Sequence, residues 1–203
     1  MRPWQIIRTP LIGRQEAGDS GRHRVQAGNV VLHAAFEAHL DRIPTSGAVV
    51  LNVSLPAQYA LRSGVGRVHD PDAIVRLVEK GDLEAAALLL WSTKIGEPEF
   101  QDWPDELAAS LAQNASINLC GWSQARGIPA WDLSRSFAKV FGISPCAFRA
   151  RARTHQAWRA IQTAGTPLSA IAVHFGFADQ AHMTRSVKTM TGRCPSAWRS
   201  ACK

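Results

Sequence analysis

Two arginines, Arg135 and Arg185, stand at equivalent places in a segment that the chain contains twice. A guanidinium group presents its N–H donors in a fixed plane, so it can bind the O6 and N7 atoms of one guanine base together. Helical spacing places further side chains on the same outward faces as these arginines. The neighbouring positions are Trp131, Ser134, Ala181 and His182. The pattern predicts two helices that present side chains to the edges of base pairs.

The segment around the two arginines is duplicated. Residues 142–149 (GISPCAFR) return as residues 192–199 (GRCPSAWR), with glycine, proline, alanine, an aromatic ring and arginine at matching places. Upstream, the copies stay aligned at an offset of 49 or 50 residues. Repeats of this length usually correspond to structural units, and two copies are too few for a solenoid. We therefore interpret the C-terminal half as a small helical module that occurs twice.

Positive charge is concentrated on the duplicated half. Residues 1–105 contain 11 Lys and Arg against 13 Asp and Glu, a net charge of −2, whereas residues 106–203 contain 12 against 3, a net charge of +9. Such an excess on a small domain attracts polyanions, either nucleic acid or an anionic membrane. The longest apolar stretch, 83–91, is too short to span a bilayer, and no signal peptide is recognisable. We expect a cytoplasmic protein with no membrane partner, whose four cysteines are reduced thiols.

Hydrophobic periodicity places the repeated residues on pairs of helices. In the second copy, apolar residues recur at helical spacing through 168–175, and residues 176–178 (GFA) then form a turn. The helix after the turn has one apolar face in each copy, namely Leu133, Phe137 and Val140 in the first and Met183, Val187 and Met190 in the second. A bracing helix followed by one that presents polar side chains is a helix-turn-helix, whose second helix enters the major groove of DNA.

Residues 176–185 (GFADQAHMTR), followed by 192–199, resemble the signature of AraC/XylS-type bacterial transcription regulators. The resemblance covers residues 106–203 and implies seven helices, which form two helix-turn-helix units joined by a long helix over 145–163. It also implies that both recognition helices enter successive major grooves on one face of the duplex. The base-facing positions of the family fall on Trp131, Ser134, Arg135, Ala181, His182 and Arg185. Lys139 and Lys188 would contact phosphates, which position a protein without specifying sequence.

The N-terminal half, residues 1–100, is interpreted as β structure followed by helices. Asp70 and Pro71 form a typical helix start, with a capping carboxylate before a proline. The expected elements are strands at 30–32 and 48–53, a glycine-containing loop at 61–70, helices at 71–79 and up to about 93, and a connector at 96–104. A helix that begins near Asp105 then leads into the duplicated half.

Regulators of this type usually carry an N-terminal sensing or dimerisation domain, often a cupin-like barrel. Gly28, Ala34, Phe36 and His39 stand at the spacing of the second cupin motif, with Ala34 and Phe36 in place of its proline and glycine. The metal ligands of the first cupin motif are absent, and a bound metal needs three or four convergent ligands. We therefore expect His39 to be a structural or surface histidine, and we expect no metal and no cofactor.

The sequence thus predicts an α+β protein, with a short cupin-like β domain and helical connector before an all-α domain of two helix-turn-helix units. The predicted function is sequence-specific regulation of transcription with double-stranded DNA as partner. RNA polymerase, a second copy of the chain and a small-molecule effector stay open as further partners. The alternative is a dimerising interaction protein or antagonist, with residues 71–112 as its contact module and a DNA-binding domain weakened by Gly121. An enzyme, such as a cupin isomerase or oxygenase, is disfavoured because too few metal ligands are recognisable.

Overall fold

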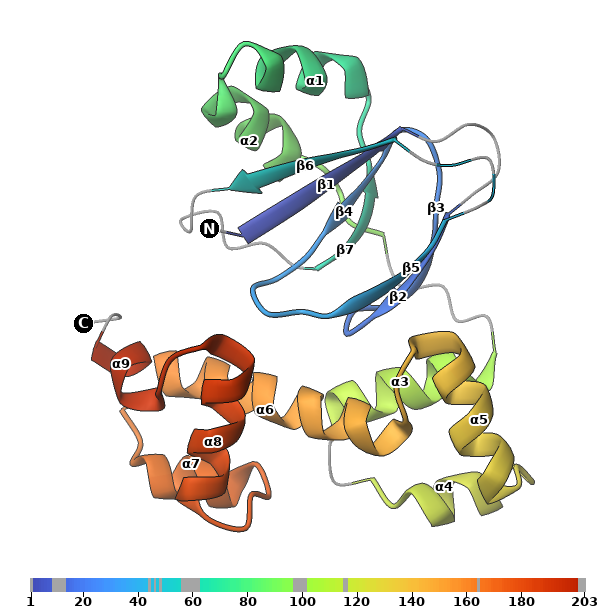
Figure 1. Ribbon diagram of the computed structural model, residues 1–203, viewed down its shortest axis with the longest axis vertical. Helices are drawn as coiled ribbons and strands as arrows, with labels where there is room; N and C mark the ends of the chain where they lie inside the picture. The colour runs from blue at the N-terminus through green and yellow to red at the C-terminus, as the bar shows by residue number, and fades with distance from the viewer. Residues whose placement is uncertain are drawn as a thin grey trace. The chain divides into compact units, whose positions relative to one another are not determined.

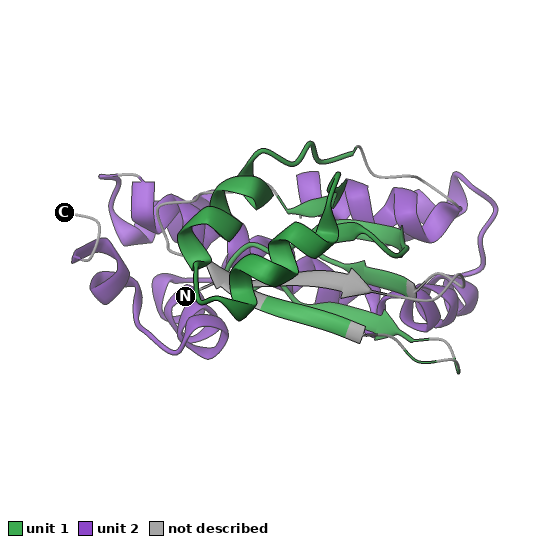
Figure 2. Cartoon of the chain, turned by 90° about the horizontal axis from the view of Figure 1, so that it is seen from above, with its two compact units in different colours: residues 1–101 green, residues 102–203 purple. Residues whose placement is uncertain are grey.

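The computed structural model describes residues 2–8, 14–43, 45, 47, 49–55, 63–96, 102–114, 117–163 and 165–200. Its strands belong to the N-terminal half, and the described C-terminal half is helical (Figure 1). The chain divides into two compact units, residues 1–101 and residues 102–203 (Figure 2). The predicted α+β class is confirmed. Among the helices of the described ranges, none is both long enough and apolar enough to cross a membrane.

The described strands of the first unit form two antiparallel sheets. The four-stranded sheet has the order β6 (Val49–Leu55), β1 (Arg2–Arg8), β4 (Asn29–Leu32) and β7 (Gly64–Arg67). The three-stranded sheet has the order β3 (Gly21–Val25), β2 (Arg14–Gly18) and β5 (His39–Arg42). Both faces of β4 are buried, since Val30 and Leu32 join one hydrophobic cluster while Val31 packs with Val25 in another.

Strand β7 corrects the expectation of a loop over 61–70. Residues Gly64–Arg67 pair with β4, and the segment after α2 lies so close that a Cβ on Gly66 would stand 2.6 Å from the Thr93 side chain. Only glycine allows this approach of two backbones. The same glycines that suggest a loop in the sequence are therefore what admits the neighbouring segment.

Two short helices cover the four-stranded sheet. Helix α1 (Pro71–Glu79) begins as predicted, with the Asp70 carboxylate accepting a hydrogen bond from the Ala73 amide at 2.9 Å. Helix α2 (Leu83–Trp91) begins with an equivalent cap from Asp82. Their buried residues, Ile74, Ala86, Ala87 and Leu90, pack with Val30, Leu32 and Val68. This apolar cluster is the main core of the first unit.

The described part of the second unit contains the seven helices that the resemblance implies. They are α3 (Trp103–Gln113), α4 (Leu119–Gln124), α5 (Ala130–Phe141), α6 (Pro145–Thr163), α7 (Leu168–His174), α8 (Gln180–Thr191) and α9 (Pro195–Ser200). Helix α3 begins two residues earlier than expected. Asn118 caps α4 by accepting from the amides of Cys120 and Gly121, whereas the expected cap, Ser116, lies outside the described residues. Cys120, Cys146 and Cys194 are free thiols, and Cys202 also lies outside the described residues.

Candidate nucleic-acid interface

Each copy of the repeat folds into two helices joined by the same tight turn. Gly127 ends the turn after α4 with a φ of 64°, and Gly176 does so after α7 with a φ of 70°. In both copies the next amide returns to the bracing helix, from Ile128 to the carbonyl of Ser123 at 3.0 Å and from Phe177 to that of Ala172 at 2.9 Å. Glycine is favoured here because residues that carry a side chain rarely adopt the left-handed backbone conformation. The duplication in sequence is thus a duplication in structure.

The first bracing helix forms despite its weak helix formers. Ser123 is buried at the place where the second copy has Ala172, and its hydroxyl donates to the Cys120 carbonyl at 3.0 Å. A buried hydroxyl is costly only when it lacks such a partner. Gly121 is exposed, and a Cβ at this position would be in ordinary contact with the side chain of the capping residue Asn118. The α4–α5 unit is therefore complete in its backbone.

The last residue of each repeated segment, 142–149 and 192–199, is an arginine that hydrogen-bonds within its own helix-turn-helix unit. Arg149 donates to the carbonyl of Ile117, just before α4, at 3.3 Å. Arg199 donates to the carbonyl of Thr166, just before α7, at 2.7 Å. Donors and acceptors are related by the repeat offset, so we call this pair the clasp arginines. Sequence reasoning aligned these arginines but gave them no role, although their repetition was the available signal.

The recognition helices α5 and α8 bury the predicted apolar faces. Leu133 and Phe137 are buried in α5, as are Met183 and Val187 in α8, while Val140 and Met190 are half-buried. Phe137 stacks on Phe141 with ring centroids 4.6 Å apart and meets Phe148 of α6 edge to face at 5.5 Å. This packing fixes the rotation of α5 about its axis, and hence which side chains face outward.

The exposed face of α5 carries all four side chains predicted from the sequence. Trp131 is 68% exposed, which is unusual for so large an aromatic group. Ser134, Arg135 and Lys139 are also exposed. The remaining polar residues of the helix interact locally, since the Ser136 hydroxyl donates to the Asp132 carboxylate at 2.6 Å. An indole, a hydroxyl and two cations therefore face outward from one helix.

On α8, three of the four predicted residues are exposed and one is not. Ala181, Arg185 and Lys188 are exposed. His182 is half-buried and meets the Phe177 ring edge to face at 5.3 Å, so part of its ring packs on the turn. Its outward orientation in the sequence prediction was therefore only partly right. The cause is a tertiary contact with a residue of the turn, which helical periodicity does not reveal.

Arg153 of α6 contacts the turn between α7 and α8. Its guanidinium group donates to the Gly176 carbonyl at 2.8 Å and lies 4.6 Å from the Phe177 ring centroid. Burial, and secondarily the positive charge of Arg149, lower the pKa of Arg153. The chain thus connects α6, the turn and His182 through one aromatic ring.

The structure also changes the setting of His39 in the first unit. Phe36 has a φ of 65°, a left-handed conformation, at the place where the cupin motif has glycine. The sequence suggested that His39 is an isolated histidine, and the structure shows that it is not. Glu16 and His33 lie beside it, and their potential ligand atoms are all within 4.8 Å of one another. The three residues belong to separate strands and loops, so no local spacing marks them.

Comparison with known proteins agrees with the helix-turn-helix geometry. A family model described as a helix-turn-helix domain matches residues 122–201. The arabinose operon regulatory proteins of Salmonella typhimurium and Escherichia coli are each 34% identical over 71 residues, or 35% of this chain. The match spans only about a quarter of these relatives, 25% and 24% of their lengths.

Two solved structures are similar in part. A probable AraC family transcriptional regulator from Rhodopseudomonas palustris is 24% identical, with 48% of this chain and 94% of that one covered and a TM-score of 0.44. For an apo form of ToxT from Vibrio cholerae, the match covers 100% of this chain and 90% of the ToxT chain, with 11% identity and a TM-score of 0.47. The family model matches the repeated segment that carries both turns and both clasp arginines. The C-terminal unit of this chain therefore contains a helix-turn-helix domain, and this domain is similar in sequence to part of the arabinose operon regulatory proteins.

Proposed function

We propose that the chain is a transcription regulator that binds double-stranded DNA with two recognition helices. The observation that carries this proposal is the pair of exposed arginines, Arg135 and Arg185, at equivalent places on α5 and α8. Each lies on the opposite side of its helix from a buried apolar face. Both belong to the half of the chain with a net charge of +9. The proposal involves no enzymatic step, and its place of action is the bacterial cytoplasm, at the nucleoid.

The two recognition helices share one support. Helices α5 and α8 both pack on α6 within the second unit. A common support favours simultaneous binding of two successive major grooves, about 34 Å or roughly 10 base pairs apart. Arg135 and Arg185 would each bind a guanine through O6 and N7. Trp131, Ser134, Ala181 and the exposed part of His182 would contact neighbouring base edges, and Lys139 and Lys188 would contact phosphates.

Selection of binding sites from random duplexes tests this assignment. Arg135→Ala and Arg185→Ala should each relax the selected motif at different base pairs, about one helical turn apart. Each loss should weaken discrimination at its own base by about 1–3 kcal/mol. Lys188→Ala is the matched control, because losing a phosphate contact weakens all sequences alike. If both arginine variants alter the same base pairs, or neither alters any, the two-helix proposal is wrong.

A second candidate function is dimerisation through the first unit. Helix α2 exposes four large apolar side chains that its own core does not need, Leu83, Leu88, Leu89 and Trp91, each at least 45% exposed. Large apolar side chains that are exposed together are typical of contact surfaces when they form a continuous patch. The alternative interaction protein would use this surface, and so would a DNA-binding dimer. Sedimentation equilibrium of the full chain tests whether it dimerises. If the dimer forms through α2, the Leu88→Glu variant should be monomeric where the parent is dimeric.

A further inference from the structure

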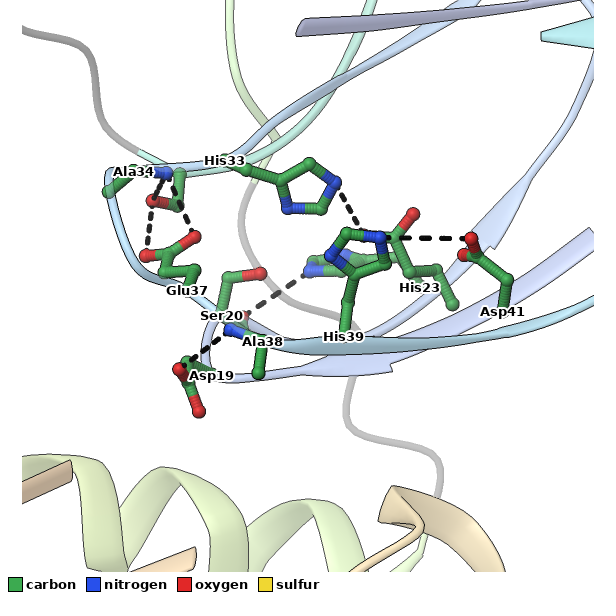
Figure 3. Close-up of polar contacts among 11 residues, drawn as sticks. Asp19, Ser20, His23, His33, Ala34, Glu37, Ala38, His39 and Asp41 are labelled. Atoms are coloured by element: carbon green, nitrogen blue, oxygen red, sulfur yellow. Dashed lines mark hydrogen bonds and ion pairs between the residues drawn. The ribbon is translucent and has the colours of Figure 1, made fainter. Parts of the chain in front are cut away.

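A buried polar cluster in the first unit brings together three classical metal-binding side chains. Glu16 and His33 are buried and His39 is exposed at the edge of the cluster. Glu16 Oε1 and His33 Nε2 are 3.4 Å apart. Figure 3 shows His33 and His39 approaching each other from different segments, with Asp41 beside His39. Two imidazoles and a carboxylate at such distances could hold one metal ion.

Strand register explains why the carboxylate and His39 meet. Glu16 of β2 pairs with His23 of β3 on one side and with Asp41 of β5 on the other. Paired residues of neighbouring strands project from the same face of a sheet, and so do residues two apart on one strand. His39 therefore projects from the same face as Glu16 and Asp41. His33, directly after β4 of the other sheet, completes the cluster.

The loop between the two histidines is held in place by several hydrogen bonds. The Ala34 amide donates to Glu37 Oε2 at 3.0 Å and to Ser63 Oγ at 3.0 Å. The Ala38 amide donates to Asp19 Oδ2 at 3.2 Å (Figure 3). A Cβ on Gly18 would stand only 2.7 Å from the Ala38 carbonyl oxygen, so this end of the loop packs directly on β2. Such support holds ligands near their binding positions before a metal arrives.

The geometry fits a tetrahedral site after one side-chain movement. Ligands about 2.1 Å from a tetrahedral zinc ion are about 3.4 Å apart, which agrees with the Glu16–His33 separation. The His33 and His39 rings are stacked, with centroids 4.1 Å apart and an interplanar angle of 11°. Parallel rings do not direct their lone pairs at one point, so the His39 ring must rotate. Its side chain is 26% exposed, which leaves space for that rotation.

The residue beside His39 resembles the outer shell of a metal site. Asp41 Oδ2 lies 3.7 Å from His39 Nε2. Metal-bound histidines commonly donate their second N–H to a carboxylate, which fixes the tautomer and the ring orientation. If the rotated ring keeps Nε2 toward Asp41, Nδ1 is the nitrogen of His39 that a metal would bind. Two imidazoles together with one carboxylate favour zinc and neighbouring divalent transition metals over magnesium or calcium.

We propose that the first unit binds one divalent transition-metal ion of the zinc class through Glu16, His33 and His39. Three protein ligands leave a fourth position for water or another small ligand. The site lies entirely within residues 1–101 and does not depend on DNA binding by the second unit. Failure of either proposal therefore leaves the other standing.

Metal titration of the tag-free full-length chain tests the site. Zn²⁺ should bind with a stoichiometry of one by calorimetry and should raise the melting temperature of the first unit. Co²⁺ should give the visible absorption of a nitrogen- and oxygen-ligated ion, without thiolate charge-transfer bands. His39→Gln should weaken binding at least about tenfold, and Asp41→Asn should weaken it about 10- to 100-fold. His69→Gln, which removes an exposed histidine of the same unit, should bind as the parent does.

His39→Gln decides the outcome, because the partly exposed side chain can be replaced without opening the core. Its melting temperature without metal should equal that of the parent. Glu16→Gln and His33→Gln should also lose binding, but these buried variants serve only if they melt normally. The proposal is overturned if Zn²⁺ does not bind stoichiometrically, if His39→Gln binds as well as the parent, or if Co²⁺ shows thiolate bands.

Discussion

Two substitutions six residues apart on α5 should have different effects. Phe137 is fully buried, stacked on Phe141 and edge to face with Phe148. Trp131 is 68% exposed on the other side of the same helix. Phe137→Ala should therefore destabilise the second unit, and Trp131→Ala should leave its stability unchanged while weakening DNA binding. The pair separates the core face of α5 from the proposed contact face.

The magnitudes differ enough to be measured without ambiguity. Truncating a buried phenylalanine costs about 3–5 kcal/mol, because the apolar contacts are lost and a cavity remains. Aromatic pairs of this geometry add about 0.5–1.5 kcal/mol. Substitutions at exposed sites usually change stability by less than about 0.5 kcal/mol. One kcal/mol shifts the melting temperature of a unit of this size by about 4–8 °C. Phe137→Ala should thus lower it by about 12 °C or more, and Trp131→Ala by less than about 4 °C.

Thermal melting of the full chain, followed by circular dichroism at a helix wavelength, measures both variants. Phe137→Leu is a matched control that keeps an apolar side chain and should give an intermediate shift. Fluorescence anisotropy with a selected duplex then measures binding by the folded variants. If Trp131→Ala melts as early as Phe137→Ala, the assigned rotation of α5 is wrong. If Trp131→Ala binds DNA as tightly as the parent, the indole is not part of the contact face.

Three further outcomes can be checked with simpler measurements. DNA affinity should fall by about 10³–10⁵ between about 50 and 200 mM salt if 6–10 phosphates are contacted, and a flat anisotropy response would contradict a DNA footprint on the basic half. Alanine at either clasp arginine, Arg149 or Arg199, should lower the stability of the second unit by about 1–2 kcal/mol in urea unfolding, since each donates a charged hydrogen bond to a carbonyl; unchanged midpoints would show that the clasps do not stabilise. A hydrogen bond from the Ser196 side chain is the main cause that lowers the pKa of Cys194. Its thiolate fraction near neutral pH is therefore raised, and mass spectrometry should find it alkylated faster than Cys146, with the difference reduced in Ser196→Ala.

The features that sequence predicts well are those with local causes. The start of α1 follows from a carboxylate and a proline at adjacent positions, and the structure has that cap at Asp70. The length of α6 follows from Pro145 and the helical run after it. The left-handed glycines that end α5 and α8, Gly142 and Gly192, are the first residues of the repeated segments 142–149 and 192–199. In each case the chemistry that decides the element lies within a few residues.

The features that sequence did not predict depend on distant partners. Strand β7 exists because β4 pairs with it and residues 93–96 pack against its glycines, and neither partner is near in sequence. The half-burial of His182 depends on where the Phe177 ring lies. Glu16 reaches His39 only through the pairing of β2 with β5. The roles of the exposed side chains on α5 and α8 stay predictions, because only a DNA complex or a selection experiment tests them.

The repeated fastening contacts separate what holds each unit together from what it exposes. Gly127, Gly142 and Arg149 have identical counterparts in the second copy, Gly176, Gly192 and Arg199. The outward position held by Trp131 in one copy is held by Ala181 in the other. Since the invariant contacts lie at turns, helix ends and carbonyls, a duplicated gene segment could change its outer surface one residue at a time while its scaffold stayed the same. The two halves of such a protein can thereby acquire different sequence preferences at little risk to folding.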